Sequence, residues 1–335
     1  MGVILGVVGL GRIGAFHTAT LSTLPGVDGL VVTDERPAVT AAVAAEFGAK
    51  AVDSAAELIA SGVDGVVVAA ATPAHASLVL ACVDAGIPVF CEKPLAATPG
   101  ESVAVVTGIE SSGVPVQIGY NRRFAPAFAA AKNAVTSGEL GWLHTVRSTT
   151  LDPAPPPMDY VAVSGGIFRD CSVHDFDTVR WIVGREVVEV YAAGSNQGDP
   201  AFAAAGDVDT ATTTLTFDNG TIGVVSNTRY NARGYDCRLE VHGSEDAVVA
   251  GWDEQVPVRN LETGATFPTG TPHSFFMDRF ASAYQLELGA FVDVVEGRLA
   301  SPCTPRDALE VAFIAEAATL SLQQHRPVRI DEVRL

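Results

Sequence analysis

The stretch VILGVVGLGRIG, residues 3–14, decides the fold. An apolar run leads into a GxGxxG pattern, and a plausible helix continues from Ala15 to Leu24. This order is typical of the first strand, turn and helix of a dinucleotide-binding unit. Gly9 would make the tight turn, Gly11 would let a pyrophosphate approach the backbone, and Gly14 would let the helix pack on the strand. Arg12 and Ile13 would add backbone N–H groups at the positive end of the helix.

The next apolar run supports this interpretation. Residues 29–33 read as a strand that ends in Asp34, about 20 residues after the glycines, where a carboxylate accepts hydrogen bonds from the adenosine ribose. Because a carboxylate repels a 2′-phosphate, the pattern favours NAD over NADP. Arg36 weakens this preference slightly, since an arginine here can accept the extra phosphate.

Strands and helices continue to alternate. Helices are predicted over 38–47, from the Asp53-Ser54 cap to Ile59, and over 77–85, and a buried strand over 65–71. Thr72, Pro73 and His75 follow that strand and should lie near the cofactor, because ligands bind at the carboxyl ends of such strands. A helix-capping or core histidine is the alternative for His75.

A further strand ends in Glu92-Lys93-Pro94, again at the expected crevice. The chain has only three lysines, Lys50, Lys93 and Lys132, so a lysine in this place is notable. Its ammonium could stabilise negative charge on a substrate oxygen as hydride leaves. A structural pair with Glu92 is the alternative. The strand predicted over 114–119 leads into Arg122 and Arg123, which could meet a polyol or phosphate or pair with carboxylates.

The segment Gly165–Asp175 offers a carboxylate beside an imidazole. Two glycines break the chain, and an amphipathic run then reaches Val183, with Gly184 as a left-handed stop. In one helix, Asp170 and His174 would be one turn apart on the same face. Such a pair can act as a general base, although a solvated or capping pair is the simpler explanation when it is considered alone.

The second half of the chain lacks the alternation of strands and helices that is predicted for the first half. Strands are predicted over 143–150, 187–193, 211–217, 220–228 and 236–242, with Asp218-Asn219-Gly220 as a hairpin turn. Helices are predicted over 281–296, starting near Ser274, and over 305–324. Residues 255–272 read as a strand-and-loop excursion. The fold class is therefore an α/β Rossmann domain with a doubly wound parallel sheet (1–120) plus an α+β domain with a large, mostly antiparallel open sheet (121–335).

Composition excludes several classes. A net charge of −18 argues against nucleic-acid and anionic-membrane surfaces. No apolar stretch approaches a membrane span, and no basic segment of a signal peptide precedes the first strand. The five cysteines form neither a zinc pattern nor a disulfide framework. We therefore expect a cytoplasmic protein that needs no metal.

Five motifs in order resemble those of the Gfo/Idh/MocA oxidoreductase family over nearly the whole chain. They are GLGRIG, Asp34, Cys91-Glu92-Lys93-Pro94-Leu95, Gly119–Phe124 and Gly165–Asp175. The segments Asp152–Pro157, His174–Trp181 and Asp278–Phe280 with Tyr284 are similar to the inositol 2-dehydrogenase branch. The resemblance implies NAD(P)-dependent oxidation of a cyclic polyol by a homo-oligomer, usually a tetramer assembled through the sheet faces.

The resemblance also implies roles for individual residues. Lys93, Asp170 and His174 match the catalytic set, in which His174 takes the hydroxyl proton, Asp170 stabilises the imidazolium and Lys93 orients the oxygen. Arg123, Tyr235 and Tyr284 fall where the branch places substrate contacts. The expected cofactor contacts are Gly9, Gly11, Arg12, Ile13, Gly14, Asp34, Thr72, Pro73, His75, Glu92 and Lys93.

One position departs from the branch. Its members usually carry Ser-Arg-Asp-Pro where this chain has Thr150-Leu151-Asp152-Pro153, so a substrate contact is lost and myo-inositol itself is in doubt. A dehydrogenase of another sugar or sugar acid therefore stays open, as does a catalytically silent regulator that senses NAD.

Overall fold

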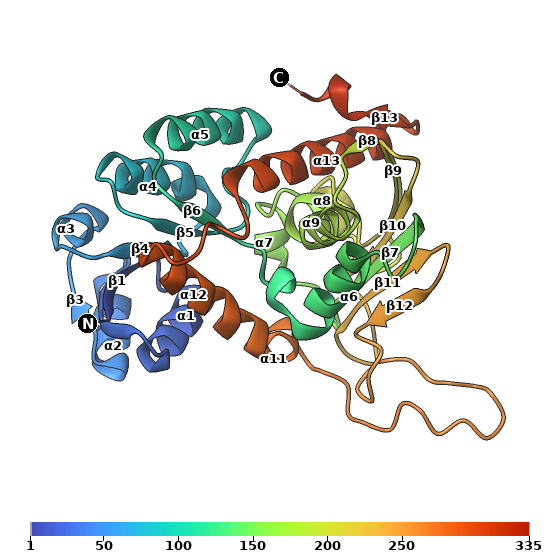
Figure 1. Ribbon diagram of the computed structural model, residues 1–335, viewed down its shortest axis with the longest axis horizontal. Coiled ribbons are helices and arrows are strands. Elements are labelled where there is room, and N and C mark those ends of the chain that lie inside the picture. Colours follow the sequence, from blue (N-terminus) through green and yellow to red (C-terminus); the bar gives the residue numbers. More distant parts are fainter. Residues whose placement is uncertain (1, 335) are drawn as a thin grey trace. The chain divides into compact units, whose positions relative to one another are not determined.

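Six parallel strands form the sheet of the first of two units into which the chain divides (Figure 1). The computed structural model describes residues 2–334. The first unit extends from the N-terminus through Asn121 and also contains Ser282–Glu310; the second contains Arg122–Ala281 and the residues from Val311 on. By this grouping residues 282–310 belong with the N-terminal unit. The single division after residue 120 that is expected from the sequence places them in the second unit instead.

The strand order in the first unit is β3-β2-β1-β4-β5-β6, with every pair parallel. The strands are β1 (Val3–Val8), β2 (Val27–Thr33), β3 (Lys50–Ala51), β4 (Gly65–Val68), β5 (Val89–Glu92) and β6 (Val116–Gly119). This is the order of a classic dinucleotide-binding fold, in which the order reverses beside β1 and creates the binding crevice. The predicted Rossmann class is confirmed.

Helices cover both faces of this sheet. They are α1 (Arg12–Thr23), α2 (Pro37–Phe47), α3 (Ala55–Ala60), α4 (Thr72–Asp84), α5 (Pro99–Ser112) and α12 (Ala281–Val295). Leu21 of α1, Val43 of α2 and Phe291 of α12 share one core with β1 and β2, while Figure 1 shows α4 and α5 on the opposite face. The apolar face of α12 therefore completes a core that the first 121 residues begin.

Helix α4 starts five residues earlier than predicted, and β4 ends three residues earlier. Pro73 lies in the first turn of the helix, where its missing N–H costs no hydrogen bond. Thr72, Pro73 and His75 are thus helical residues.

The second unit is built on a seven-stranded sheet of order β12-β11-β7-β10-β9-β8-β13. Its strands are β7 (Leu143–Leu151), β8 (Val187–Ser195), β9 (Thr210–Phe217), β10 (Ile222–Thr228), β11 (Asp236–Gly243), β12 (Ala247–Ala250) and β13 (Val328–Arg329). Among these strands, β7 and β10 form the one parallel pair, and the other neighbours are antiparallel. The predicted mostly antiparallel sheet is confirmed, as is the 218–220 turn, where Gly220 has a φ of 87°.

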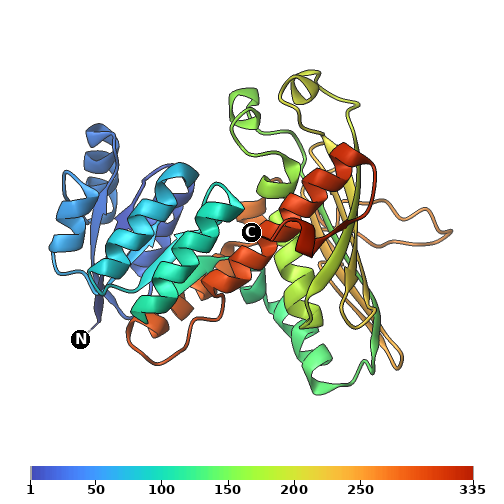
Figure 2. The ribbon, with the colours of Figure 1, turned by 90° about the horizontal axis from the view of Figure 1, so that it is seen from above.

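One face of this sheet is covered by helices. The unit contains η1 (Asn121–Phe124), α6 (Pro126–Ser137), α7 (Met158–Val161), α8 (Ile167–Asp170), α9 (Ser172–Val183), α10 (Ala201–Ala204), α11 (Phe276–Arg279), the end of α13 (Pro305–Gln324) and η2 (Ile330–Glu332). Figure 2 shows the strands nearly edge-on, with α9 and α13 on the same side. Ser321 of α13 accepts a hydrogen bond from the backbone N–H of Ala192 on β8, at 2.9 Å.

The other face of this sheet is open to solvent along much of its length. On β7, β8 and β10 exposed or half-exposed side chains alternate with buried ones, as expected for a sheet with one wet face. The segment between β12 and α11 is an irregular excursion that extends from the unit in both views. The predicted start of the α12 helix near Ser274 is wrong, because α11 is separate and α12 begins at Ala281.

Candidate functional site

Glycine is needed at each of the three positions of the first turn for a different structural reason. A Cβ on Gly9, whose φ is +88°, would lie 2.4 Å from the Cα of Ala70, and one on Gly14 would lie 1.9 Å from the carbonyl oxygen of Gly9. A Cβ on Gly11 would meet no described heavy atom within 4 Å. Gly9 and Gly14 are therefore required by the packing, whereas Gly11 leaves space beside the N-terminal end of α1. A pyrophosphate fits that space.

Alanine at Gly11 and at Gly14 should have opposite effects. Gly11 has a φ of −65°, which alanine tolerates, so Gly11→Ala should weaken NAD binding by tenfold or more with little change in melting temperature. Gly14→Ala should lower the melting temperature, because its Cβ overlaps backbone. Calorimetric titration with NAD and thermal unfolding of both variants check the pair. Equal loss of stability in the two variants would contradict this assignment.

Asp34 lies directly after β2 with its carboxylate held in place. Its Oδ2 accepts a hydrogen bond from the backbone N–H of Leu10 at 2.7 Å, and its Oδ1 accepts from Nε of Arg36 at 2.9 Å. The bond from Arg36 lowers the pKa of Asp34 from 3.8 to about 2. Because folding lowers this pKa, the associated stabilisation is complete above pH 4 and is lost as the pH falls toward 2. At neutral pH the end of β2 therefore carries a fixed negative charge.

Neutralising Asp34 should relax cofactor choice. In Asp34→Asn the repulsion of a 2′-phosphate is removed, and Arg36, released from its carboxylate partner, becomes available to that phosphate. We expect the ratio of kcat/KM for NAD over NADP to fall by tenfold or more. A tenfold change corresponds to about 1.4 kcal/mol in the relative binding free energy of the two cofactors. Asp28→Asn, at the opposite end of β2, is the matched control. An unchanged ratio in Asp34→Asn would refute the role.

His75 ties two loops together. Its ring is buried in the first turn of α4, with Nδ1 2.7 Å from the carbonyl oxygen of Pro94 and Nε2 2.9 Å from that of Ala70. The buried ring therefore holds the loop after Lys93 against the loop after β4.

Glu92 is buried and paired with a residue that the sequence did not single out. Its Oε1 lies 2.6 Å from Nε2 of His17, which is fully buried in α1, and its Oε2 accepts from the backbone N–H of Lys93 at 3.2 Å. The ring of Tyr284 packs edge-on against Phe16 and His17, with centroids 5.3 and 5.8 Å apart. Glu92 thus links the helix of the glycine turn to the backbone of half-buried Lys93.

Asp170 and His174 lie on two consecutive helices rather than one. Gly165 and Gly166 have φ values of 83° and 88°, as expected for a chain break, but α8 ends at Asp170 and α9 begins at Ser172. The backbone N–H of His174 donates to the carbonyl oxygen of Cys171 at 3.3 Å, three residues earlier, as in a 3₁₀-type turn. The expectation that both residues lie in one continuous helix is therefore wrong, because the chain is interrupted at Cys171 between α8 and α9.

Asp170 contacts residues from two other segments of the second unit. Its Oδ2 accepts from Nη2 of Arg229 at 2.7 Å, and its Oδ1 accepts from the hydroxyl of Tyr160 at 2.9 Å. Arg229 also donates from Nη1 to Asp152 at 2.9 Å. Arg229 and Tyr160 were missed at the level of sequence, where nothing in their local pattern sets them apart.

The two adjacent arginines both pair with carboxylates of α9. Arg122 donates from Nη1 to Asp175 at 2.7 Å, and Arg123 contacts Asp177 through Nε at 2.9 Å and Nη2 at 2.5 Å. All four side chains are buried. Of the two alternatives for these arginines, carboxylate pairing is the one observed.

Tyr235 is buried in the second unit before β11. Its backbone N–H donates to His273 at 2.8 Å and its ring packs edge-on against Phe280. Burial raises the pKa of its phenol well above the usual value, so the hydroxyl stays protonated at neutral pH.

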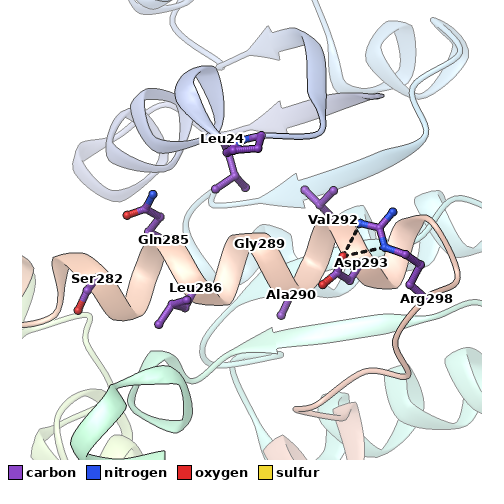
Figure 3. A pocket seen from close by; sticks show the side chains of 10 residues that line it. Leu24, Ser282, Gln285, Leu286, Gly289, Ala290, Val292, Asp293 and Arg298 are labelled. Atoms are coloured by element: carbon purple, nitrogen blue, oxygen red, sulfur yellow. Dashed lines mark hydrogen bonds and ion pairs between the residues drawn. The ribbon is translucent and has the colours of Figure 1, made fainter. Parts of the chain in front are cut away.

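A groove in the first unit does not involve any predicted site residue. It has a volume of about 600 Å³ and runs along α12, where Leu24 and Gln285 face it and Asp293 pairs with Arg298 (Figure 3). Among residues 2–334, no cluster of three His, Cys, Asp or Glu side chains is arranged to hold a metal, and no helix is long and apolar enough to cross a membrane.

Comparison with known proteins agrees with this architecture. Residues 3–120 match the oxidoreductase family with an NAD-binding Rossmann fold, and residues 128–249 match the GFO/IDH/MocA C-terminal domain. The chain is 38% identical to myo-inositol 2-dehydrogenase of Thermotoga maritima, covering 98% of this chain and 99% of that one. It is 35% identical to scyllo-inositol 2-dehydrogenase (NAD(+)) of Bacillus subtilis, covering 98% and 96%.

A solved structure gives the same result. The scyllo-inositol dehydrogenase of Lactobacillus casei with bound NAD(H) and scyllo-inositol superposes with a TM-score of 0.90 at 27% identity, covering 99% of this chain and all of that one. With both halves matched and the glycine turn and Asp34 in place, the chain belongs to the GFO/IDH/MocA family of NAD-binding oxidoreductases.

Proposed function

We propose that this enzyme oxidises a ring hydroxyl of an inositol to the ketone. The proposal rests on one observation above the others: relatives similar over the whole chain include inositol dehydrogenases, and one of them was solved with NAD(H) and scyllo-inositol bound. NAD, when bound, accepts the hydride from the carbon that carries the hydroxyl.

We assign the proton to His174. A neutral imidazole can accept a hydroxyl proton at neutral pH. Asp170, held by Arg229 and Tyr160, supplies the negative charge that stabilises the imidazolium. Lys93 hydrogen-bonds the substrate oxygen and stabilises the charge that develops there.

We propose that Gly9, Gly11, Arg12, Ile13 and Gly14 hold the pyrophosphate, that Asp34 holds the ribose, and that Thr72, Pro73, His75, Glu92 and Lys93 line the rest of the cofactor site. We propose Arg123, Tyr235 and Tyr284 as substrate contacts, each held in place by the buried contacts of its side chain.

We further propose a tetramer in the cytoplasm. The open face of the seven-stranded sheet, with exposed Tyr191 and Ile222, offers a surface for a second copy. The five cysteines are all free and buried, as expected in a reducing compartment. Light scattering of the purified protein tests the assembly.

The decisive experiment follows the appearance of reduced nicotinamide with myo-inositol, scyllo-inositol, aldoses and sugar acids. An inositol should give the highest kcat/KM. A higher value with an aldose or sugar acid would favour the alternative that Leu151 leaves open. Tight NAD binding without reduction by any of these compounds would favour the silent regulator.

A further inference from the structure

Arg229 joins two carboxylates at the carboxyl ends of β7 and β10. Thr228 of β10 is in register with Leu151 of β7, and the two strands run parallel, so the next residues, Arg229 and Asp152, emerge side by side. The backbone N–H of Asp152 donates to the carbonyl oxygen of Thr228 at 2.9 Å. This parallel pairing thus brings an arginine and an aspartate together at one edge of the sheet.

The guanidinium of Arg229 donates to each carboxylate from a different nitrogen. Nη1 lies 2.9 Å from Asp152 and Nη2 lies 2.7 Å from Asp170, while the three side chains are 6%, 20% and 13% exposed. Nε of Arg229 is buried and has no hydrogen-bond partner among the described residues. Arg123, by contrast, uses Nε and Nη2 together on Asp177.

This difference matters for what the cluster does. A two-pronged contact to one carboxylate is the stronger arrangement for stability, and an orphaned N–H carries a cost. Arg229 gives up the two-pronged contact and instead bridges a carboxylate anchored on the sheet to the one at the end of α8. The cluster therefore fixes where Asp170 points more than it adds stability.

We propose that Arg229 and Asp152 are positioning residues for the reaction, which hold Asp170 in place and set the charge beside His174. The proposal rests on the proposed function, in which Asp170 supports His174. Two carboxylates and one guanidinium leave one net negative charge, and that charge favours the imidazolium. The groups that face the cluster are Cys171, Tyr160, Tyr235 and the Arg122–Asp175 pair.

Two substitutions should shift the titration midpoint of His174 in opposite directions. Arg229→Gln leaves two carboxylates uncompensated, so His174 should hold its proton to higher pH. Asp152→Asn leaves Arg229 and Asp170 as a neutral pair, so His174 should lose its proton at lower pH. The readout is an NMR titration of the histidine-labelled full chain, with the His174 signal assigned from its loss in His174→Ala.

Kinetics test the positioning itself. Arg229→Gln should lower kcat about 10- to 100-fold without changing the Kd for NAD, as expected when a catalytic group is displaced by about 1 Å. Arg229→Lys should recover part of this loss, because lysine keeps the positive charge but lacks the two guanidinium nitrogens that reach the two carboxylates. Arg185→Gln, which removes an exposed ion pair with Asp218, is the control and should change neither readout.

The outcomes separate the two hypotheses. Absence of inositol oxidation by the unaltered enzyme would remove the proposed function, yet the titration would still test the cluster. Titration midpoints that do not move, or that move in the same direction in both variants, would overturn the inference. If Arg229→Gln does not fold, Asp152→Asn and Arg229→Lys decide it by the same two measurements.

Discussion

Replacing His174 by alanine is expected to lower turnover by about 10²- to 10⁴-fold, the range that general-base catalysis contributes. The ring is the group that we propose to receive the hydroxyl proton, and no other residue in its helical turn can do so at neutral pH. Asp175, the next residue, is fully buried and already accepts hydrogen bonds from Arg122, Ser148, Thr150 and Asn227. Loss of the imidazole therefore removes the base without a local substitute.

The affinity for NAD should be unchanged in His174→Ala, because the glycine turn and Asp34 belong to the other unit. Steady-state kinetics with saturating substrate and calorimetry with NAD give the two quantities. His144→Ala, on the exposed side of β7, is the matched control and should keep full turnover. Near-normal kcat in His174→Ala at saturating substrate would show that another group takes the proton.

Asp175→Ala is expected to cost about 3–5 kcal/mol in the free energy of unfolding, the usual effect of removing one partner of a buried ion pair. Asp175 is 0% and Arg122 3% exposed, and their nearest atoms are 2.7 Å apart. Ser148 and Thr150 of β7 donate to the same carboxylate at 2.5 and 2.8 Å. The variant would leave a buried guanidinium and two hydroxyls without their acceptor.

Denaturant unfolding followed by circular dichroism measures this cost. Asp218→Ala, which breaks a half-exposed pair with Arg185, should cost less than about 1 kcal/mol. The double variant Arg122→Met with Asp175→Leu should recover part of the loss, because it removes both buried charges, while Ser148, Thr150 and Asn227 still lack their acceptor. A cost below 1 kcal/mol for Asp175→Ala would mean that solvent reaches the pair.

The first unit could be predicted well from sequence because its signals are local. A strand, a glycine turn and a helix follow one another within residues 3–24, and each later strand is marked by an apolar run. The return of α12 to this unit could not be predicted, since it depends on Phe291 and Leu288 packing into a core about 280 residues earlier in the chain. An amphipathic pattern gives the buried face of a helix but not its partner.

The candidate site divides in the same way. Asp170 and His174 stand out because their spacing is short, whereas Arg229 lies 59 residues beyond Asp170 and meets it only through the pairing of β7 with β10. His17 escaped notice for the same reason, since Glu92 is 75 residues away. The break between α8 and α9 was missed because helix propensity does not report where a single hydrogen bond fails.

The two buried ion pairs that Asp175 and Asp177 of α9 make with arginines also affect how this enzyme could change its substrate in evolution. Asp175 and Asp177 follow His174 closely, and both are committed to buried arginines, so most substitutions around them would unfold the protein before they altered its selectivity. The Pro-rich loop over residues 153–157 lies outside these pairs, and Ala154 and Pro157 in it are exposed. New specificities should therefore accumulate on that loop, and laboratory selection for other polyols should find its first mutations there.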